Sequence, residues 1–334
     1  MFKNVLVTGG AGYVGSLLTP QLLDKGYNVT VYDIMFFGDD FLPKDHPNLT
    51  IVEGDIRDTD ALSRVLKGQD VVISLACISN DASFELDESL STTINLDAFE
   101  PMVICAKKAG VKRFVYASSS SVYGVSDAPE VTEDHPLVPL TLYNEYKGLC
   151  EPLLFKHQTD YFVCTVIRPA TLCGYAPRQR LDLSVNILTN LAINNSKITV
   201  FGGSQLRPNL HVQDMCDLYQ LLMTAPDEQI AGEVFNCGYE NMSIMDIAKR
   251  AQAIVAEEMP SIESVEIVTT PTDDIRSYHV NSDKIKNKLG FQPKHSVEDA
   301  IRDLCRAFNA GKIPNSLDDD WYYNVRRLKA LNAA

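Results

Sequence analysis

A tyrosine and a lysine four residues apart are the first candidates for proton transfer in this sequence. Tyr143 and Lys147 stand at the two ends of the segment Tyr-Asn-Glu-Tyr-Lys, and a spacing of four places both side chains on one face of a helix. A nearby ammonium favours the phenolate and lowers the pKa of a phenol, so Tyr143 could act as a general base near neutral pH. Pairs with this spacing are also common on helix surfaces, so the assignment needs a second signal.

A serine-rich segment upstream supplies that signal. A strand-like apolar run at 113–117 is followed directly by four serines and the sequence Val-Tyr-Gly. Residues just after the carboxyl end of a strand lie where ligands bind in open α/β sheets. Ser119 can therefore hydrogen-bond a substrate hydroxyl that Tyr143 deprotonates, and Ser120 and Ser121 are expected to contact the same substrate. Together with the tyrosine–lysine pair, these serines predict a dehydrogenase-type centre.

A glycine-rich turn near the start of the chain predicts a dinucleotide site. Gly9, Gly12 and Gly15 are spaced three apart between a β-like run and an amphipathic helix. The first glycine allows the tight turn, the second lets the backbone approach a pyrophosphate, and the third lets the helix pack closely on the strand. The helix N-terminus then faces the anion with its partial positive charge. Tyr13 and Val14, inside the same turn, are expected to contact the cofactor.

A carboxylate placed after the second strand favours NAD over NADP. Asp33 follows Gly15 by 18 residues, the position from which an acidic side chain accepts the ribose hydroxyls of adenosine. No Arg or Lys lies between Asp33 and Asp40 to bind a 2′-phosphate. Further along, Asp55 and Ile56 could contact the adenine ring, although Asp55 could instead cap the next helix.

The elements that must position these residues alternate as in a parallel sheet with crossover helices. Near-continuous apolar runs are typical of strands buried on both faces. The predicted strands are Asn4–Thr8, Asn28–Asp33, Leu49–Glu53, Val71–Leu75, Arg113–Ala117 and Phe162–Arg168, and the predicted helices include Tyr13–Lys25, Glu88–Ala109 and Tyr143–His157. This rhythm predicts an α/β fold with a Rossmann-like, doubly wound parallel sheet.

The second half has a different rhythm, in which Gly- and Pro-rich loops alternate with shorter helices. We therefore expect residues 1–168 to form an NAD-binding Rossmann domain and residues 169–334 to form a smaller α/β substrate domain. A later strand near 234–236 could return to the first sheet.

The amino-acid composition restricts the classes of molecule that this protein is expected to bind. The chain has 30 Lys and Arg against 44 Asp and Glu, a formal charge of −14, which argues against nucleic acid or an anionic membrane as a partner. The eight cysteines form no Cys-x-x-Cys pair and the six histidines show no metal spacing. We expect no metal and no signal peptide, and a cytoplasmic protein with reduced thiols.

These motifs resemble those of the extended short-chain dehydrogenase/reductase family, in the branch of NAD-dependent nucleotide-sugar epimerases and dehydratases. The resemblance runs from Asn4 to about Pro293. It implies a Rossmann domain that holds NAD and a small C-terminal domain that binds a nucleotide-diphosphate sugar. It also implies that Tyr143 is the base, that Lys147 tunes it and contacts the nicotinamide ribose, and that Ser119 is the third catalytic residue.

The resemblance extends to further binding positions. For the cofactor it implies contacts from Leu75, Ala76, Cys77, Asn95 and Pro169. For the sugar nucleotide it implies contacts from Ser79, Asn80, Thr171, Asn186, Val200 and Phe201, with Arg207 and Arg276 as the two phosphate clamps. An arginine suits a phosphate because its donors form a fixed fork. The family also implies a homodimer, in which the helices at 88–109 and 143–157 pack as a four-helix bundle.

The two residues that precede the Val-Tyr-Gly sequence limit the reactions that members of this branch can catalyse. Dehydratases of this branch carry Asp-Glu there, decarboxylating members a Glu and 3,5-epimerases a Cys, whereas this chain has Ser120 and Ser121. The string resembles that of 4-epimerases acting through a 4-keto sugar. Thr171, Cys173 and Pro208 depart from the usual epimerase residues, which leaves open a nucleotide-sugar 4-dehydrogenase, a 4-ketoreductase or another isomerase. A cofactor-sensing protein without activity is a third possibility.

Overall fold

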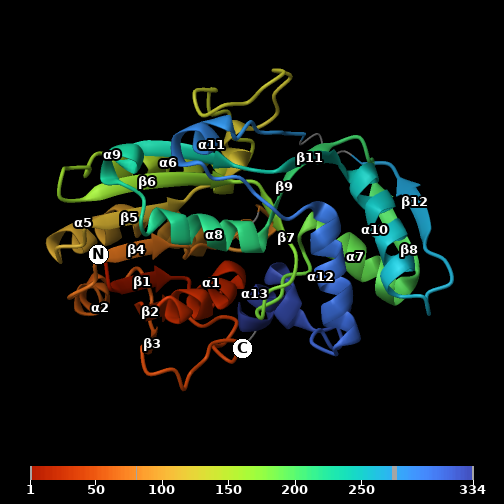
Figure 1. Ribbon diagram of the computed structural model, residues 1–334, viewed down its shortest axis with the longest axis horizontal. Helices are drawn as coiled ribbons and strands as arrows, with labels where there is room; N and C mark the ends of the chain where they lie inside the picture. Colours follow the sequence, from red (N-terminus) through yellow and green to blue (C-terminus); the bar gives the residue numbers. More distant parts are fainter. Residues whose placement is uncertain (1, 80, 273–276, 333–334) are drawn as a thin grey trace.

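The protein is described by a computed structural model that covers residues 2–79, 81–272 and 277–332. Its centre is a seven-stranded parallel sheet with the strand order β10-β6-β5-β4-β1-β2-β3 (Figure 1). The strands are β1 (Asn4–Thr8), β2 (Asn28–Asp33), β3 (Leu49–Glu53), β4 (Val71–Ser74), β5 (Arg113–Ala117), β6 (Val163–Pro169) and β10 (Glu233–Cys237). The predicted Rossmann-like α/β fold is confirmed, because the strand order reverses next to β1.

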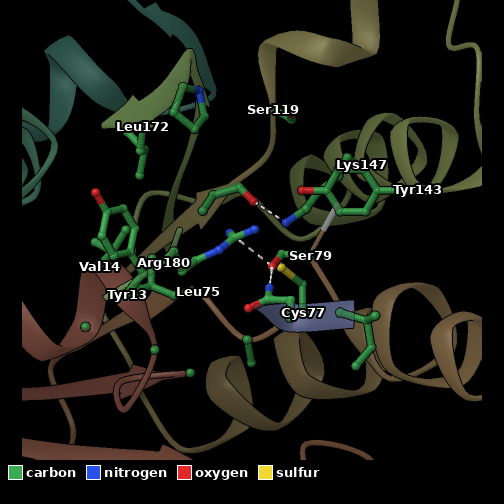
Figure 2. A pocket seen from close by; sticks show the side chains of 18 of the residues that line it. Tyr13, Val14, Leu75, Cys77, Ser79, Ser119, Tyr143, Lys147, Leu172 and Arg180 are labelled. Carbon is green, nitrogen blue, oxygen red and sulfur yellow. Dashed lines mark hydrogen bonds between the residues drawn. The ribbon is translucent and has the colours of Figure 1, made fainter. Parts of the chain in front are cut away.

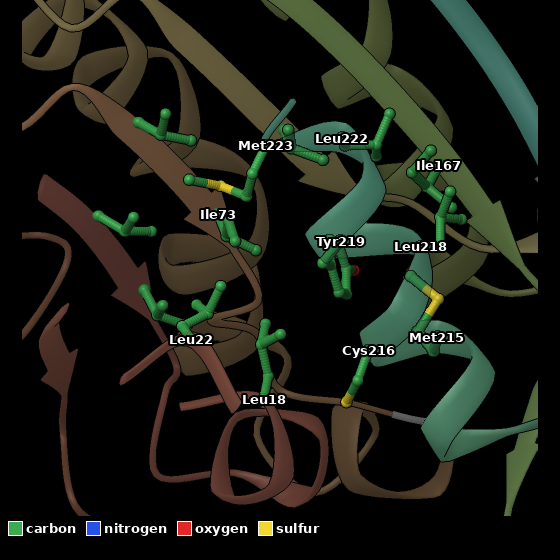
Figure 3. Close-up of a cluster of buried hydrophobic side chains, with 14 of the residues drawn as sticks. Leu18, Leu22, Ile73, Ile167, Met215, Cys216, Leu218, Tyr219, Leu222 and Met223 are labelled. Atoms are coloured by element: carbon green, nitrogen blue, oxygen red, sulfur yellow. The ribbon is translucent and has the colours of Figure 1, made fainter. Parts of the chain in front are cut away.

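Helices cover both faces of this sheet. α1 (Tyr13–Asp24) and α8 (Val212–Leu222) lie side by side on one face, and α2 (Thr59–Val65), α5 (Phe99–Lys108) and α6 (Leu142–Phe155) pack on the other. Neighbouring residues of a strand point to opposite faces. In β1, Val5 and Val7 accordingly join the α1 side, while Leu6 joins the α5 side. Figure 3 shows the first cluster, where side chains of α1 and α8 meet those of the sheet.

The predicted helix at 88–109 is interrupted. It consists of α4 (Glu88–Thr92), a π-helical segment η1 (Thr93–Asp97) and α5. A π-helical turn contains an extra residue, and here Asn95 lies within it with its side chain bound to the backbone of Ile78. The interruption was not visible in the hydrophobic pattern, because its cause is a contact with a residue on another segment.

The second region lies beside the carboxyl ends of the main strands. It contains a three-stranded sheet of β7 (Thr171–Cys173), β9 (Leu206–His211) and β11 (Glu240–Ser243), and a parallel pair of β8 (Lys197–Phe201) and β12 (Glu266–Thr270). Three helices, α7 (Ser184–Asn195), α10 (Ile244–Glu258) and α12 (Val297–Asn309), pack together around a separate apolar cluster. Figure 1 shows this region at one end of the molecule.

The chain passes between the two regions several times. α8 and β10 follow residue 169 in sequence, yet both pack with the first sheet. The remaining short helices are α3 (Asp81–Phe84), η2 (Ser120–Tyr123), α9 (Asp227–Ile230), α11 (Asp283–Leu289) and η3 (Asp320–Tyr322). The last described helix, α13 (Asn324–Asn332), returns to the first region, where Leu328 joins the buried cluster on the α5 side of the sheet. Among the described residues, no helix is both long and apolar enough to cross a bilayer.

Candidate active site

A cavity of about 360 Å³ opens at the carboxyl ends of the parallel strands (Figure 2). It extends from the glycine-rich turn to α6 and β7. Most residues that the sequence analysis assigned to cofactor or substrate line this cavity: Gly9, Gly12, Tyr13, Val14, Gly15, Asp33, Asp55, Ile56, Leu75, Ala76, Cys77, Ser79, Ser119, Ser120, Ser121, Tyr143, Lys147, Pro169 and Thr171. Tertiary folding therefore brings three separate motifs to one site.

The glycine-rich turn has the close packing that a pyrophosphate cradle requires. Gly9 has a φ of +71°, and a Cβ there would lie 2.6 Å from the backbone nitrogen of Ala76. A Cβ on Gly15 would overlap the backbone of Gly10. Gly12 caps the N-terminus of α1 at the cavity wall, so the partial positive charge of the helix faces the cavity. The turn fits a dinucleotide.

Asp33 is held at the edge of the same turn. Its carboxylate accepts hydrogen bonds from the backbone nitrogens of Ala11 (3.0 Å) and Met35 (2.9 Å). Burial raises the pKa of Asp33, and these two hydrogen bonds oppose that rise. The carboxylate is therefore positioned before any ligand arrives, as binding to ribose hydroxyls requires.

Asp55 is paired with an arginine rather than capping a helix. The Arg57 guanidinium donates to both carboxylate oxygens of Asp55, whereas Asp58 caps α2 by accepting from two backbone nitrogens. Burial acts to raise the pKa of Asp55, but the hydrogen bonds from Arg57 lower it overall. The residue that caps this helix is therefore Asp58 and not Asp55, which the sequence had left as an alternative.

Asn95 shapes the cavity without lining it. Its amide oxygen accepts from the Ile78 nitrogen at 2.8 Å, and its amide nitrogen donates to the Ile78 carbonyl at 2.9 Å. This pair of bonds fixes the loop after β4, which carries Cys77 and Ser79 into the cavity wall. In the structure Asn95 is a positioning residue for that loop.

Tyr143 and Lys147 both project from α6 toward the cavity (Figure 2). The Lys147 ammonium donates to the carbonyl of Ala117 at 2.6 Å, which ties α6 to the end of β5. Burial raises the pKa of Tyr143 well above its usual value, nearby acidic groups including Asp81 add to this, and the Arg180 guanidinium acts in the opposite direction. Burial thus sets the direction of the shift, and the lowering of the Tyr143 pKa that was expected from Lys147 is not seen.

The serines after β5 are joined to one another. The Ser119 and Ser121 hydroxyls lie 2.7 Å apart, and the Ser121 hydroxyl also donates to the side chain of Asn144. Ser120 is buried. Among the described residues, no hydrogen bond involves the Tyr143 hydroxyl, so Ser119 and Tyr143 face the cavity as separate groups that a substrate hydroxyl could bridge.

Two arginines in the cavity wall were missed by the sequence analysis. Arg178 is 2% exposed and Arg180 lies near the middle of the cavity in Figure 2. Arg180 is paired with Asp182 at 2.9 Å and donates to Ser79 at 3.3 Å. In the described structure, the Arg178 Nε and Arg180 Nη2 atoms are buried and have no hydrogen-bond partner. The signal in the sequence was the segment Pro-Arg-Gln-Arg, two cations in a loop of an acidic chain.

Other assigned substrate residues lie elsewhere. Arg207 lines an adjoining cavity of about 210 Å³, and its guanidinium lies 5.2 Å from the ring centroid of Tyr278. Neither cavity is lined by Val200, which is in the core of the second region, or by Phe201, which is 57% exposed. Asn80 and Arg276 lie outside the described residues.

Asn186 departs from its expected role as a phosphate contact. It is completely buried, and its amide bonds the backbone of Gly174 and the carbonyl of Arg180. The Tyr13 hydroxyl donates to the same Gly174 carbonyl at 2.6 Å. Both side chains therefore join the glycine-rich turn to the second region, and the amide nitrogen of Asn186 is already bonded within the protein. No group of residues in the described part of the chain is arranged to hold a metal ion.

A Rossmann sheet with a glycine-rich turn, an acidic residue after β2 and a serine–tyrosine–lysine set defines an NAD-dependent short-chain dehydrogenase/reductase. Residues 5–238 match the NAD dependent epimerase/dehydratase family, and the chain belongs to this family. The protein is accordingly an enzyme with NAD as its cofactor.

Similar proteins span nearly the same length. The low-salt glycan biosynthesis protein Agl12 of Haloferax volcanii is 30% identical over 307 residues, covering 89% of this chain and 96% of Agl12. A UDP-glucose 4-epimerase of Lactobacillus helveticus is 28% identical, with 89% and 94% covered. The structure of DesIV, a dTDP-glucose 4,6-dehydratase from Streptomyces venezuelae with NAD bound, has a TM-score of 0.80 at 25% identity, with 92% and 98% covered.

Proposed function

We propose that this enzyme is a nucleotide-sugar 4-epimerase that works through a transient 4-keto sugar. The observation that carries the proposal is the pair Ser120 and Ser121, which begin η2 shortly after β5. Water loss needs a general acid and a base beside the sugar, and neither serine can supply a carboxylate. Ser121 is instead bonded to Ser119 and Asn144. Overall similarity does not decide the reaction, since epimerases and dehydratases match this chain at 28% identity alike.

The chain's own residues account for the proton transfers. Tyr143, as the phenolate, takes the proton of the 4-hydroxyl and becomes the phenol, which later returns this proton to the ketone oxygen, while Ser119 holds that oxygen by a hydrogen bond. Lys147, bound to Ala117, keeps α6 in register with β5. NAD, which the glycine-rich turn and Asp33 would hold, would supply the acceptor for a hydride from C4 of the sugar and the donor for its return to the opposite face. Positioning supplies most of the catalysis, because no covalent intermediate with the protein is needed.

The substrate is proposed to be held by its diphosphate. Arg207 stands at the adjoining cavity, next to Ser121 and Thr171, and Arg276 is the second clamp proposed from the sequence. A sugar anchored only through its diphosphate can turn between the two hydride-transfer steps, so that either face of the ketone meets the cofactor. The base of the nucleotide and the sugar stereochemistry are left to experiment.

The test uses purified protein and a panel of UDP-, GDP-, CDP- and dTDP-sugars without added cofactor, with mass and NMR analysis of the products. An isomer of unchanged mass supports epimerisation. A product two hydrogens lighter, formed once per site, would instead indicate a 4-dehydrogenase, and a product that has lost water would indicate a dehydratase. Either of the last two results contradicts the proposed reaction.

We further propose a cytoplasmic homodimer. The exposed Leu142 and Leu149 are seven residues apart on α6, and so lie on one face of that helix. The helix α6 itself packs beside η1 and α5. Apolar side chains on one outward face favour association. All eight cysteines are free thiols, as suits a reducing compartment. A solution mass of a monomer alone at micromolar concentration would contradict the dimer.

A further inference from the structure

The C-terminal segment folds back over the cofactor cavity. It follows the second region in sequence and lies beyond residues 5–238, which match the family. Asn324 and Leu328 of α13 nevertheless line the cavity together with the glycine-rich turn and the loops after β2 and β4. The cavity thus has a wall that comes from α13, which also packs beside α3.

One set of contacts joins α13 to the loop after β2. The Arg327 Nε atom donates to the carbonyl of Phe36 at 2.7 Å, and the Arg327 guanidinium lies 4.1 Å from the ring centroid of Trp321. The Trp321 ring in turn lies against the backbone of Gly38. This loop begins directly after Asp33, so α13 is anchored on the segment that would bind the adenosine ribose.

Asn324 connects α13 to the loop after β4 and to the second region, which form two other walls of the cavity. Its amide nitrogen donates to the Ser79 hydroxyl at 2.7 Å, and its amide oxygen accepts from the Arg178 guanidinium at 2.7 Å. Its backbone nitrogen donates to Asp182 at 3.2 Å. One buried side chain therefore joins the loop after β4 to the second region.

The enclosed end of the cavity is mainly apolar. Leu328 is 7% exposed and belongs to the same buried cluster as Ile56, against which Phe36 also packs. The Arg178 guanidinium lies 3.5 Å from the ring centroid of Phe37. A flat aromatic base fits between apolar side chains and a guanidinium, and Arg178 Nε is a buried donor whose missing partner costs stability until an acceptor arrives.

We propose that α13 is part of the cofactor site: Leu328 packs against the adenosine half of NAD, and Asn324 and Arg327 hold the helix across it. NAD then leaves only when α13 detaches, so the cofactor stays with the enzyme through many turnovers. The proposal concerns NAD alone and goes beyond the proposed sugar chemistry. It holds whether the enzyme epimerises, oxidises or reduces its substrate.

The first test measures cofactor release. Protein saturated with NAD is mixed with an excess of a fluorescent etheno analogue of NAD, and exchange is followed in the wild type, Leu328→Asp and Arg327→Gln. A contact worth about 1.4 kcal/mol corresponds to a tenfold change in a dissociation constant. If the lost contact acts on the release of NAD, each variant should release NAD about tenfold faster or more. Lys329→Ala, on the exposed side of the same helix, is the matched control and should exchange at the wild-type rate. Wild-type exchange in both variants would overturn the proposal.

A second measurement does not depend on a folded variant. Hydrogen exchange of the backbone amides of residues 324–332 is compared in the wild-type protein with and without NAD. Cofactor packed under α13 should slow exchange in this helix, whereas α10, in the second region, should show no change. Equal exchange in α13 with and without NAD would refute the proposal even if sugar turnover is normal. Failure of the epimerase proposal, by contrast, would appear only in the product analysis.

Discussion

A buried ion pair behind the serines offers a quantitative test of how the site is held. The Glu151 carboxylate lies four residues after Lys147 on α6 and is 5% exposed. It accepts from Arg168 twice, at 2.9 and 2.6 Å, and from the Ser118 hydroxyl at 2.6 Å. The pair therefore joins α6 to β6 and to the residue just before Ser119.

Glu151→Ala should destabilise the protein strongly. The variant leaves the Arg168 guanidinium, 6% exposed, without its counter-charge, although it keeps hydrogen bonds to the Tyr123 hydroxyl and the Glu133 carbonyl. Removing one partner of a buried pair costs about 3–5 kcal/mol, because an uncompensated charge remains in a low-dielectric interior. Since two hydrogen bonds remain on Arg168, we expect a loss near the lower end, about 3 kcal/mol.

The assay is the free energy of unfolding from urea titration, with NAD absent. The double variant Glu151→Leu with Arg168→Met removes both charges and should recover most of the loss, since apolar replacements of buried pairs are often neutral. Tyr161→Ala, an 85% exposed site, serves as a surface control. A loss below about 1 kcal/mol for Glu151→Ala, the range of an exposed pair, would refute the reasoning.

Further predictions concern the base, the dimer and acid stability. Tyr143→Phe should lower turnover about 10²- to 10⁴-fold while NAD remains bound, and Tyr146→Phe on the same helix should stay near wild type; normal turnover without the Tyr143 hydroxyl would rule it out as the base. Leu149→Arg should shift the solution mass to that of a monomer, which light scattering would detect. The acid stability concerns Asp182. Burial acts to raise the pKa of this carboxyl, but the ion pair with Arg180 lowers it overall. That stabilisation is present above the unfolded carboxyl pKa and is lost as pH falls below about 4, so Asp182→Asn should show a weaker decline in melting temperature on acidification.

Much of the site was predictable because its motifs are local. Three glycines at fixed spacing, the acidic residue that ends β2 and the tyrosine–lysine pair on one helical turn each depend on backbone geometry within a few residues. The strands they follow are apolar runs, and parallel strands deliver their carboxyl ends to one edge of the sheet. The predicted catalytic residues Ser119, Tyr143 and Lys147 were therefore expected on one side, and the structure places them in one cavity.

Other features of the structure depend on partners far away in the sequence. Asn186 was predicted to contact a phosphate, but in the structure it is buried, and Tyr13, 173 positions away, lies within its hydrogen-bonded network. The interruption of the helix at 88–109 follows from the bond between Asn95 and Ile78, which no periodicity reveals. The pKa of Tyr143 depends on burial, and burial is a property of the packed chain.

The sequence by itself determined the fold class and the cofactor, and it predicted Ser119, Tyr143 and Lys147 as the catalytic set, because hydrophobic period and residue spacing specify local geometry. Only the tertiary structure decided which cations and which helix line the cavity. Asn324 meets Ser79 across 245 positions and Arg327 meets Phe36 across 291, and contacts so far apart arise from the packing of whole elements. The wall of the cavity that α13 forms is a consequence of that packing.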